Sequence, residues 1–272
     1  MSNGTLYICP TPIGNLEDIT LRALRILKEV DIIACEDTRV TQKLLNHYEI
    51  NTKTISYHKF SEKQKSSYLS ELLKEGKNIA LVSDAGTPVI SDPGSELLKV
   101  LAEENINIVS LAGACALTVA VSSVYLEKNG FMFAGFLPKK DKEIEELLLK
   151  YKTTNLIIYE APSRLIATLK TIDQILDNPN VVVARELTKF YEEVRKDTAQ
   201  NLIDYYESKG VKGEIVLIIE GKDELFSLED SIILEKAKKL KKEGFSTKDI
   251  SKIISILENI SKSQVYNLIK DL

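Results

Sequence analysis

The sequence contains no tryptophan, only two histidines and only three cysteines, and each shortage excludes a class of site. The cysteines, Cys9, Cys35 and Cys115, do not have the spacing of metal ligands, and the histidines are His47 and His58. We therefore expect neither a metal site nor a disulfide framework. Each cysteine lies in or beside an apolar run, where the usual role is that of a small buried hydrophobic residue.

Long apolar runs are also missing. No stretch approaches the roughly 20 apolar residues that cross a bilayer, and the N-terminus has no basic start followed by an apolar segment. We expect a cytoplasmic protein that does not enter a membrane. The formal charge of −4 argues against a general polyanion binder, because such binders depend on many Lys and Arg contacts to phosphate. Any nucleic-acid site must then be a local patch.

What the sequence does contain is enough apolar material for two ordinary domains. Its 272 residues are 44% hydrophobic and 28% charged, which is typical of a globular protein. In the stretch NIALVSDAGTPVISDPG at 78–94, a buried strand at 79–82 precedes a polar glycine loop and then a helical pattern. In open α/β folds such loops lie at the carboxyl edge of the sheet, where ligands bind. A plain turn is the alternative, because these residue types form turns in any protein.

The same order of strand, polar loop and helix recurs through the first half of the chain. We expect further strands at 6–9, 31–35, 52–57 and 106–111. Asp18 or Thr20 is expected to cap the first helix. The loop after the first strand is not GxGxxG, so a dinucleotide site is poorly supported. The loop EDTR is either a helix N-terminus capped by Asp37 or Thr38 or part of a polar site.

From residue 131 the pattern restarts and indicates a second α/β domain. We expect strands at 131–136, 155–159, 181–184 and 214–219, with a helix at 144–151 and another that ends near 176. Three short helices follow, at 232–242, 247–257 and 263–272, the last opened by a capping box from Ser261 to Gln264. The expected domains are an N-terminal α/β domain at 1–113, a C-terminal α/β domain at 114–224 and a helical appendage at 225–272. The appendage either contacts RNA or serves as a helical cap or dimer contact.

Several motifs along the chain occur in the order of one known family. They are TPIGNLEDITLRAL at 11–24, CEDTR at 35–39, ISYH at 55–58, ALVSDAGTPVISDPG at 80–94, GFLPKK at 135–140, YEAPSRL at 159–165, VARELTKFYEEV at 183–194 and KGEIVLIIEG at 212–221. The chain resembles the bacterial small-subunit ribosomal RNA methyltransferase I family, within the tetrapyrrole-methylase superfamily of S-adenosylmethionine-dependent enzymes. One departure lies at 113–115, where Gly-Ala-Cys stands in place of the family's usual Gly-Pro-Ser.

This resemblance implies two α/β domains of the tetrapyrrole-methylase type with a small C-terminal helical appendage. It implies transfer of a methyl group from S-adenosylmethionine to the ribose 2′-oxygen of one cytidine in the decoding centre of 16S ribosomal RNA. It also implies a homodimer, with the cofactor folded into the cleft between the two α/β domains. Two alternatives remain open, a tetrapyrrole or other small-molecule methyltransferase of the same fold and a non-catalytic ribosome-binding protein.

Loop position and the resemblance together give a set of candidate site residues. The expected cofactor contacts are Pro12, Gly14, Asp84, Ala85, Gly86, Thr87, Ala112 and Gly113. The ribose hydroxyl is a weak acid, so a general base or a cation near it would help, and the candidates are Asp37, Glu186 and Lys189. Candidate RNA contacts, able to hold phosphates or orient carboxylates, are Arg39, His58, Lys59, Arg164 and Arg185. For any one of these a structural ion pair is at least as good an interpretation.

Overall fold

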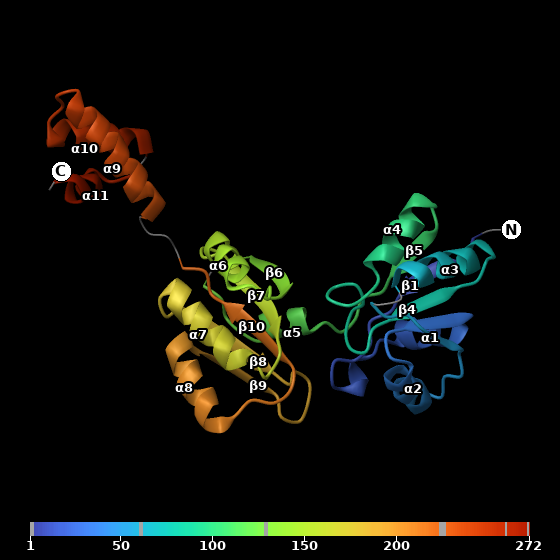
Figure 1. The fold of residues 1–272 in the computed structure, drawn as a ribbon. Coiled ribbons are helices and arrows are strands. Elements are labelled where there is room, and N and C mark those ends of the chain that lie inside the picture. Colours follow the sequence, from blue (N-terminus) through green and yellow to red (C-terminus); the bar gives the residue numbers. More distant parts are fainter. Residues whose placement is uncertain (1–2, 60–61, 128–129, 223–226, 259, 271) are drawn as a thin grey trace. The chain divides into compact units, whose positions relative to one another are not determined.

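The computed structural model describes residues 3–59, 62–127, 130–222, 227–258, 260–270 and 272 (Figure 1). By its internal contacts the chain divides into two units, Met1–Gly221 and Lys222–Leu272. The first unit holds two sheets, and the second holds three helices. The domain boundary expected between residues 113 and 114 lies inside the first unit and stays a prediction. The boundary expected between 224 and 225 lies outside the described residues.

Five parallel strands form the first sheet, in the order β3-β2-β4-β1-β5. All four side chains of β4 are buried, as expected for its uninterrupted apolar run. Helices α3 and α4 cover one face of this sheet, and α1 and α2 cover the other. The bounds are β1 Thr5–Ile8, α1 Leu21–Glu29, β2 Ile32–Cys35, α2 Thr38–His47, β3 Thr54–Ser56, α3 Glu62–Lys74, β4 Ile79–Val82, α4 Ser95–Glu103 and β5 Asn107–Ser110. The expected strands are all present, with ends that differ by one or two residues.

The second sheet has five strands in the order β6-β7-β10-β8-β9. Strands β6 and β7 are parallel, and the other neighbours are antiparallel. The sequence pattern does not predict β9 or α8. Strand β9 reads EVRKDT, and this charged strand lies at the edge of the sheet, so it lacks the apolar alternation of an inner strand. The bounds are β6 Phe131–Phe136, α6 Asp141–Lys150, β7 Asn155–Glu160, α7 Leu165–Leu176, β8 Asn180–Arg185, β9 Glu193–Thr198, α8 Ala199–Lys209 and β10 Ile215–Ile219.

The two faces of the second sheet are covered by different parts of the chain. Helices α6, α7 and α8 pack on one face, where Leu148, Leu169 and Leu202 are fully buried. The other face carries Ile157, Val182 and Ile218 and packs against α5, which spans Ala116–Ser122. Ile13, from the loop after β1, belongs to the same apolar cluster. Residues on the first loop of the chain are thereby brought against the second sheet.

Side-chain caps begin several helices where the sequence predicts them. Thr20 caps α1 by accepting from the N–H of Ala23, and Asp37 caps α2 by accepting from the N–H of Arg39. Ser261 caps α11 in the expected capping box with Gln264. These bonds satisfy N–H groups that lack partners inside the helix. The three caps fix where each helix begins.

The unit Lys222–Leu272 is a small helical bundle with a core of its own. Its helices are α9 Ser227–Lys242, α10 Thr247–Glu258 and α11 Lys262–Ile269. Ile233, Ile254 and Ile269, one from each helix, are almost fully buried against one another. Amphipathic helices of this length depend on such packing for their stability. The bundle confirms the expected helical appendage.

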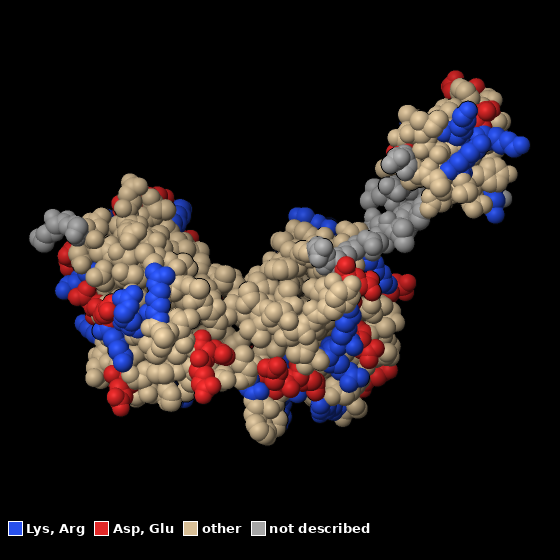
Figure 2. All heavy atoms as spheres, turned by 180° about the vertical axis from the view of Figure 1, so that it is seen from behind, with Lys and Arg blue, Asp and Glu red and all other residues tan. Residues whose placement is uncertain are grey.

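Cys9 and Cys35 are buried, as expected, and burial raises the pKa of the Cys9 thiol to about 12. In the part of the chain that the structure describes, none of the helices combines the length and apolarity that crossing a membrane requires. Figure 2 shows basic and acidic side chains mixed over one face of the Met1–Gly221 unit, in place of one continuous basic surface. On this face, contacts to a polyanion must therefore be local.

Candidate active site

Two loops of the first sheet are joined directly to each other at its carboxyl edge. The backbone of Thr11 pairs with that of Gly86 through two N–H to C=O bonds, each 2.9 Å long. Thr11 follows β1 and Gly86 follows β4, and these two strands are neighbours in the sheet. Gly86 has a φ of +79°, which a residue with a side chain rarely adopts. The loops that the sequence singles out therefore meet at one place.

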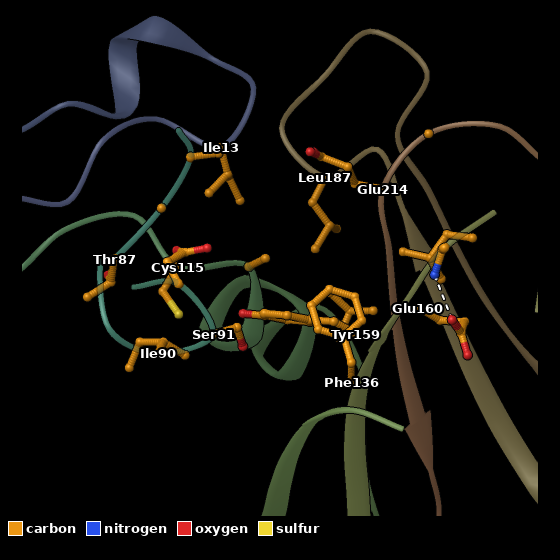
Figure 3. Close-up of a pocket in the computed structure, with 18 of the residues that line it drawn as sticks. Ile13, Thr87, Ile90, Ser91, Cys115, Phe136, Tyr159, Glu160, Leu187 and Glu214 are labelled. Atoms are coloured by element: carbon orange, nitrogen blue, oxygen red, sulfur yellow. Dashed lines mark hydrogen bonds between the residues drawn. The ribbon is translucent and has the colours of Figure 1, made fainter. Parts of the chain in front are cut away.

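A pocket of about 350 Å³ lies where these loops meet the ends of the second sheet (Figure 3). This volume is in the range of small-molecule sites. In Figure 3, Leu187 from the loop after β8 and Tyr159 from β7 point into the space, opposite Ile13 and Cys115. The lining residues are Ile13, Ala85, Gly86, Thr87, Ile90, Ser91, Asp92, Cys115, Ala116, Phe136, Tyr159, Glu160, Ala161, Pro162, Leu187, Gly213, Glu214, Ile215 and Val216. We call this the larger pocket.

The wall of the larger pocket combines apolar surface with negative charge. None of the residues described as lining it is Lys or Arg, whereas Asp92, Glu160 and Glu214 are carboxylates. Burial, followed by repulsion from Asp84, raises the pKa of the Asp92 carboxyl above its usual range. The wall therefore suits a ligand with apolar and cationic parts and no phosphate.

Tyr159 is the centre of an aromatic group in this wall. Its ring meets Phe133 edge-on at a centroid distance of 4.9 Å and Phe136 at 5.9 Å. Burial raises the pKa of the Tyr159 phenol, so it stays protonated at neutral pH. Edge-to-face packing of this kind holds rings in fixed orientations. The aromatic group gives the pocket a rigid apolar side.

Hydrogen bonds fix the backbone loops around the pocket. The Thr87 hydroxyl donates to the carbonyl of Ala114 at 2.9 Å, which ties the loop after β4 to the loop after β5. Glu160 accepts from the N–H of Ala161 at 2.8 Å and from the hydroxyl of Thr168 at 2.6 Å, and its side chain is almost fully buried. The Glu160 carboxylate therefore stabilises the conformation of its own loop.

The expected cofactor residues fall into three groups. Ala85, Gly86 and Thr87 line the larger pocket. Pro12, Gly14 and Asp84 line a second pocket of about 240 Å³, which we call the smaller pocket. Neither set of lining residues includes Ala112 or Gly113. A Cβ on Gly113 would lie 2.6 Å from Cβ of Pro10, so this glycine permits close packing of two loops.

Asp37 is held in place by its neighbours. Its carboxylate accepts from the Arg39 backbone at 2.8 Å and from the Arg39 guanidinium at 2.6 Å. These bonds lower the pKa of Asp37 to about 2. Its own N–H donates to the Asp84 carboxylate at 3.0 Å. Asp37 is a helix cap and a weak base in this arrangement.

Glu186 and Lys189 form an ion-paired cluster with Glu214 beside the larger pocket. The Lys189 ammonium lies 2.9 Å from Glu186 and 2.8 Å from Glu214. Partial burial acts to lower the pKa of Lys189, but hydrogen bonds to both carboxylates outweigh it and raise the pKa. The bond from Lys189 lowers the pKa of Glu186. At neutral pH this cluster presents one ammonium held by two carboxylates.

The expected RNA contacts are spread over the first unit. The Arg39 side chain is 87% exposed, although it pairs with Asp37. His58 and Lys59 follow β3. Arg164 lies near Glu160, with a nitrogen to oxygen distance of 3.7 Å. Arg185 is 15% exposed and lies 3.7 Å from Glu193, so little of its guanidinium is open to a phosphate.

Sequence reasoning missed the part of the larger pocket that the second sheet contributes. Phe136, Leu187 and the segment 213–216 lie in motifs already quoted for the family resemblance, and Cys115, from the loop after β5, lies at the departure from the family pattern. The signal that could have found them is the position of GFLPKK, YEAPSRL and KGEIVLIIEG at the ends of strands. Within the described residues, no group of three His, Cys, Asp or Glu side chains is placed to hold a metal ion.

Comparison with known proteins decides the family. The model of the tetrapyrrole (corrin/porphyrin) methylases matches residues 5–203. The ribosomal RNA small subunit methyltransferase I of Halalkalibacterium halodurans is 42% identical, over 97% of this chain and 94% of its own. The protein of that name from Escherichia coli O157:H7 is 45% identical, over 81% of this chain and 79% of its own. The chain belongs to the ribosomal RNA small subunit methyltransferase I family.

Solved structures share the fold at low sequence identity. A diphthine synthase superimposes with a TM-score of 0.64 at 13% identity, covering 80% of this chain and 90% of that chain. A cobalt precorrin-4 methyltransferase superimposes with a TM-score of 0.58 at 17% identity, covering 79% and 94%. These structural similarities confirm the tetrapyrrole-methylase fold. They do not indicate which substrate the chain acts on.

Membership of this family makes the chain a methyltransferase that uses S-adenosylmethionine. The larger pocket has the chemistry that this cofactor requires. S-adenosylmethionine has a sulfonium, an ammonium, a carboxylate and an adenosine but no phosphate. The pocket offers carboxylates, apolar walls and loop backbone, without any Lys or Arg among its described lining residues. The residues present therefore fit the cofactor.

Proposed function

We propose that this enzyme methylates the ribose 2′-oxygen of a cytidine in 16S ribosomal RNA of the small subunit. The RNA substrate rests on the names of relatives that are 40% to 45% identical to the chain, and the ribose 2′-oxygen of a cytidine rests on the family resemblance of the motifs. The structural observation that supports it is the larger pocket, whose described lining combines apolar walls with Asp92 and lacks Lys and Arg. From the proposed ribosomal substrate we infer that the reaction takes place in the cytoplasm.

The larger pocket is the proposed cofactor site. Ile13, Tyr159 and Leu187 would enclose the apolar parts of the cofactor, and Asp92 would face one of its two cationic groups, the sulfonium or the ammonium. When bound, S-adenosylmethionine supplies an electrophilic methyl group. The loops after β1, β4 and β5 are bonded to one another, so the first-sheet side of the site is held in shape before the substrate arrives.

Lys189 is the proposed group for the developing negative charge on the ribose oxygen. Its ammonium lies beside Glu214, which lines the larger pocket, and its raised pKa keeps it protonated at neutral pH. A cation held in position stabilises a developing alkoxide without further reorganisation. Glu186, kept ionised by Lys189, is the nearest proposed proton acceptor in the same cluster. Asp37 lies outside this cluster, and its carboxylate is bound to Arg39.

Methyl transfer to isolated ribosomal particles tests this function. Small subunits from cells that lack this methylation would be incubated with methyl-labelled S-adenosylmethionine, and the labelled nucleotide would be mapped by mass spectrometry. We expect label on the 2′-oxygen of one cytidine of 16S RNA. Label on a base, or on a precorrin supplied in parallel with none on RNA, contradicts the proposal. Failure to bind S-adenosylmethionine at all supports the non-catalytic alternative.

We also propose that the enzyme is a homodimer, as the family resemblance implies. The test is sedimentation equilibrium over a range of protein concentrations. A mass of about twice the 30.5 kDa of one chain supports the dimer, and a mass of one chain at every concentration contradicts it.

A further inference from the structure

Two neighbouring aromatic side chains, Phe190 and Tyr191, lie almost wholly in solvent. Phe190 is 93% exposed and Tyr191 is 71% exposed. Their rings meet edge-on at a centroid distance of 5.0 Å. Single exposed apolar residues are ordinary on protein surfaces, but a contacting pair at such exposure is a candidate binding surface. We call these two residues the aromatic pair.

The loop that carries the aromatic pair is held rigidly by its own bonds. The N–H of Lys189 donates to the carbonyl of Glu186 at 3.0 Å, and the N–H of Glu192 donates to the carbonyl of Lys189 at 3.1 Å. The Glu192 carboxylate accepts from the N–H of Thr188 at 2.5 Å. Glu186 and Thr188 have φ values of +52° and +67°, which are rare for residues with side chains. Such strain persists where the surrounding structure enforces it, and it concentrates at functional sites.

The aromatic pair stands at the edge of the proposed active site. Leu187, three residues before Phe190, lines the larger pocket, and so does Glu214. Lys189, the residue directly before the pair, bonds to Glu214 at 2.8 Å. Nucleotides on either side of a ribose bound at Lys189 must therefore pass close to this loop.

The charged side chains of the loop are already paired or hydrogen-bonded. The Lys189 ammonium is held by Glu186 and Glu214, and Glu192 is bonded to the loop backbone. A loop with more carboxylates than ammonium groups does not attract a phosphate backbone. What it offers a nucleic acid is two aromatic faces, the surface on which unpaired bases stack.

We propose that Phe190 and Tyr191 are a stacking platform for unpaired bases next to the methylated nucleotide. This inference rests on the proposed ribosomal RNA substrate. A second protein chain is a poorer partner for this surface, because two aromatic side chains bury only roughly 300 to 500 Å², which is less than a protein interface needs. A standard protein interface buries about 800 Å² on each partner. Unpaired bases need only the two ring faces, and the loop presents these without rearrangement.

The absence of tryptophan from the chain allows a direct test. Tyr191→Trp introduces a single indole fluorophore at the platform, and Tyr125→Trp introduces one at another exposed site, where the native side chain is 79% exposed. We expect a cytidine-rich oligoribonucleotide to quench the emission of Tyr191→Trp and to leave that of Tyr125→Trp unchanged. Inorganic polyphosphate, which has charge but no bases, should quench neither. Equal quenching of Tyr191→Trp by RNA and by polyphosphate, or no quenching by RNA, overturns the proposal.

Kinetics with small ribosomal subunits give an independent readout. Stacking on one aromatic side chain is worth on the order of tenfold in affinity, so Phe190→Ala with Tyr191→Ala should raise the KM for subunits at least about tenfold. The Kd for S-adenosylmethionine should stay at the wild-type value, and Tyr125→Ala should behave as wild type. Circular dichroism melting checks that the exposed substitutions leave the fold intact.

The outcomes separate this inference from the proposed function. If the wild type methylates subunits and the double variant has an unchanged KM, the platform is wrong and the proposed function stands. If the wild type does not methylate subunits under any condition, the proposed function fails, and the platform fails with it. If the double variant converts a wild-type dimer to monomers in sedimentation, the aromatic pair is a protein interface and the proposal is overturned.

Discussion

Gly14 lies so close to Lys189 that a Cβ atom on Gly14 would be 2.4 Å from Cγ of that lysine. The two residues come from the loop after β1 and the loop after β8, which are far apart in the sequence and belong to different sheets. Side-chain atoms do not approach to this distance, so the contact exists only because residue 14 is glycine. This contact packs the first loop of the chain against the proposed cation of the active site.

Gly14→Ala should therefore destabilise the protein. Forcing a methyl group into a closely packed contact costs about 1–3 kcal/mol. In a Lys189→Ala background the clashing Cγ is absent, while Thr188 Oγ1 still lies 2.9 Å from the added Cβ, so the same substitution should cost less but not nothing. Thermal unfolding of the four proteins in this double-mutant cycle measures the coupling. Equal destabilisation in both backgrounds would show that the Gly14 contact is not with Lys189.

Lys189→Ala should lower the rate of methyl transfer more than it lowers cofactor affinity. Loss of one group that stabilises developing negative charge costs on the order of a hundredfold in kcat. The measurements are single-turnover methylation of small subunits and calorimetric titration of S-adenosylmethionine. Lys170→Ala, which removes another ion-paired lysine, is the matched control. Equal losses in rate and affinity would reassign Lys189 to cofactor binding or folding.

Asp92→Asn should weaken binding of S-adenosylmethionine by roughly tenfold or more, because a charged hydrogen-bond partner in the larger pocket is lost. Burial raises the pKa of Asp92, so wild-type affinity should fall on acidification at a higher pH than an exposed aspartate would give. The variant should lack that fall. Titrations over a range of pH measure both effects, with Asp204→Asn on α8 as the control. A variant with wild-type affinity and an unchanged pH profile would remove Asp92 from the site.

Glu193 should contribute to the free energy of unfolding at neutral pH, and this contribution should be lost at acidic pH. Partial burial acts to raise its pKa, but bonds from Lys209, Tyr206 and Tyr205 outweigh burial and lower the pKa to about 2. A depressed carboxyl pKa stabilises the fold above the unfolded value of about 4.3, and this contribution is lost as the pH falls toward the folded value. Glu193→Gln should therefore cost roughly 2–3 kcal/mol at neutral pH.

Urea denaturation at neutral pH and at about pH 3 measures this contribution. The difference in unfolding free energy between Glu193→Gln and wild type should be smaller at the lower pH. Glu145→Gln, on the exposed face of α6, is the control and should have little effect at either pH. A difference that is the same at both pH values would mean that the stabilisation does not depend on the charge of Glu193.

The sequence predicts the first sheet well because buried parallel strands leave a clear pattern. The apolar run at 79–82 is β4, and its side chains are all buried. Helix starts at Thr20, Asp37 and Ser261 follow from capping chemistry, which is local in sequence. Strand β9 is missed because its charged residues are typical of a solvated segment, and only its pairing with β8 makes it a strand.

The site is predictable from the sequence only in part. Ala85, Gly86 and Thr87 are found because their loop follows an obvious strand. Leu187 and Phe136 are missed, because single apolar side chains show nothing of their role until two sheets bring them together. From the sequence alone, Asp37 is a candidate base. The structure shows that its carboxylate is bound to the Arg39 guanidinium, and such a bond depends on side-chain geometry that the sequence does not reveal. Whether a residue lines a pocket depends on contacts between distant parts of the chain. Hydrophobic periodicity and secondary-structure propensity are local, so they do not predict it.

Calorimetric titration of S-adenosylmethionine into Leu187→Arg tests the central claim most directly, because this substitution puts a cation into the wall of the larger pocket. Leu149→Arg, at a site on α6 that is 43% exposed, is the matched control. We expect no measurable binding to Leu187→Arg and wild-type binding to Leu149→Arg, with both proteins folded by circular dichroism. Wild-type affinity in a folded Leu187→Arg protein would contradict the assignment of this pocket to the cofactor.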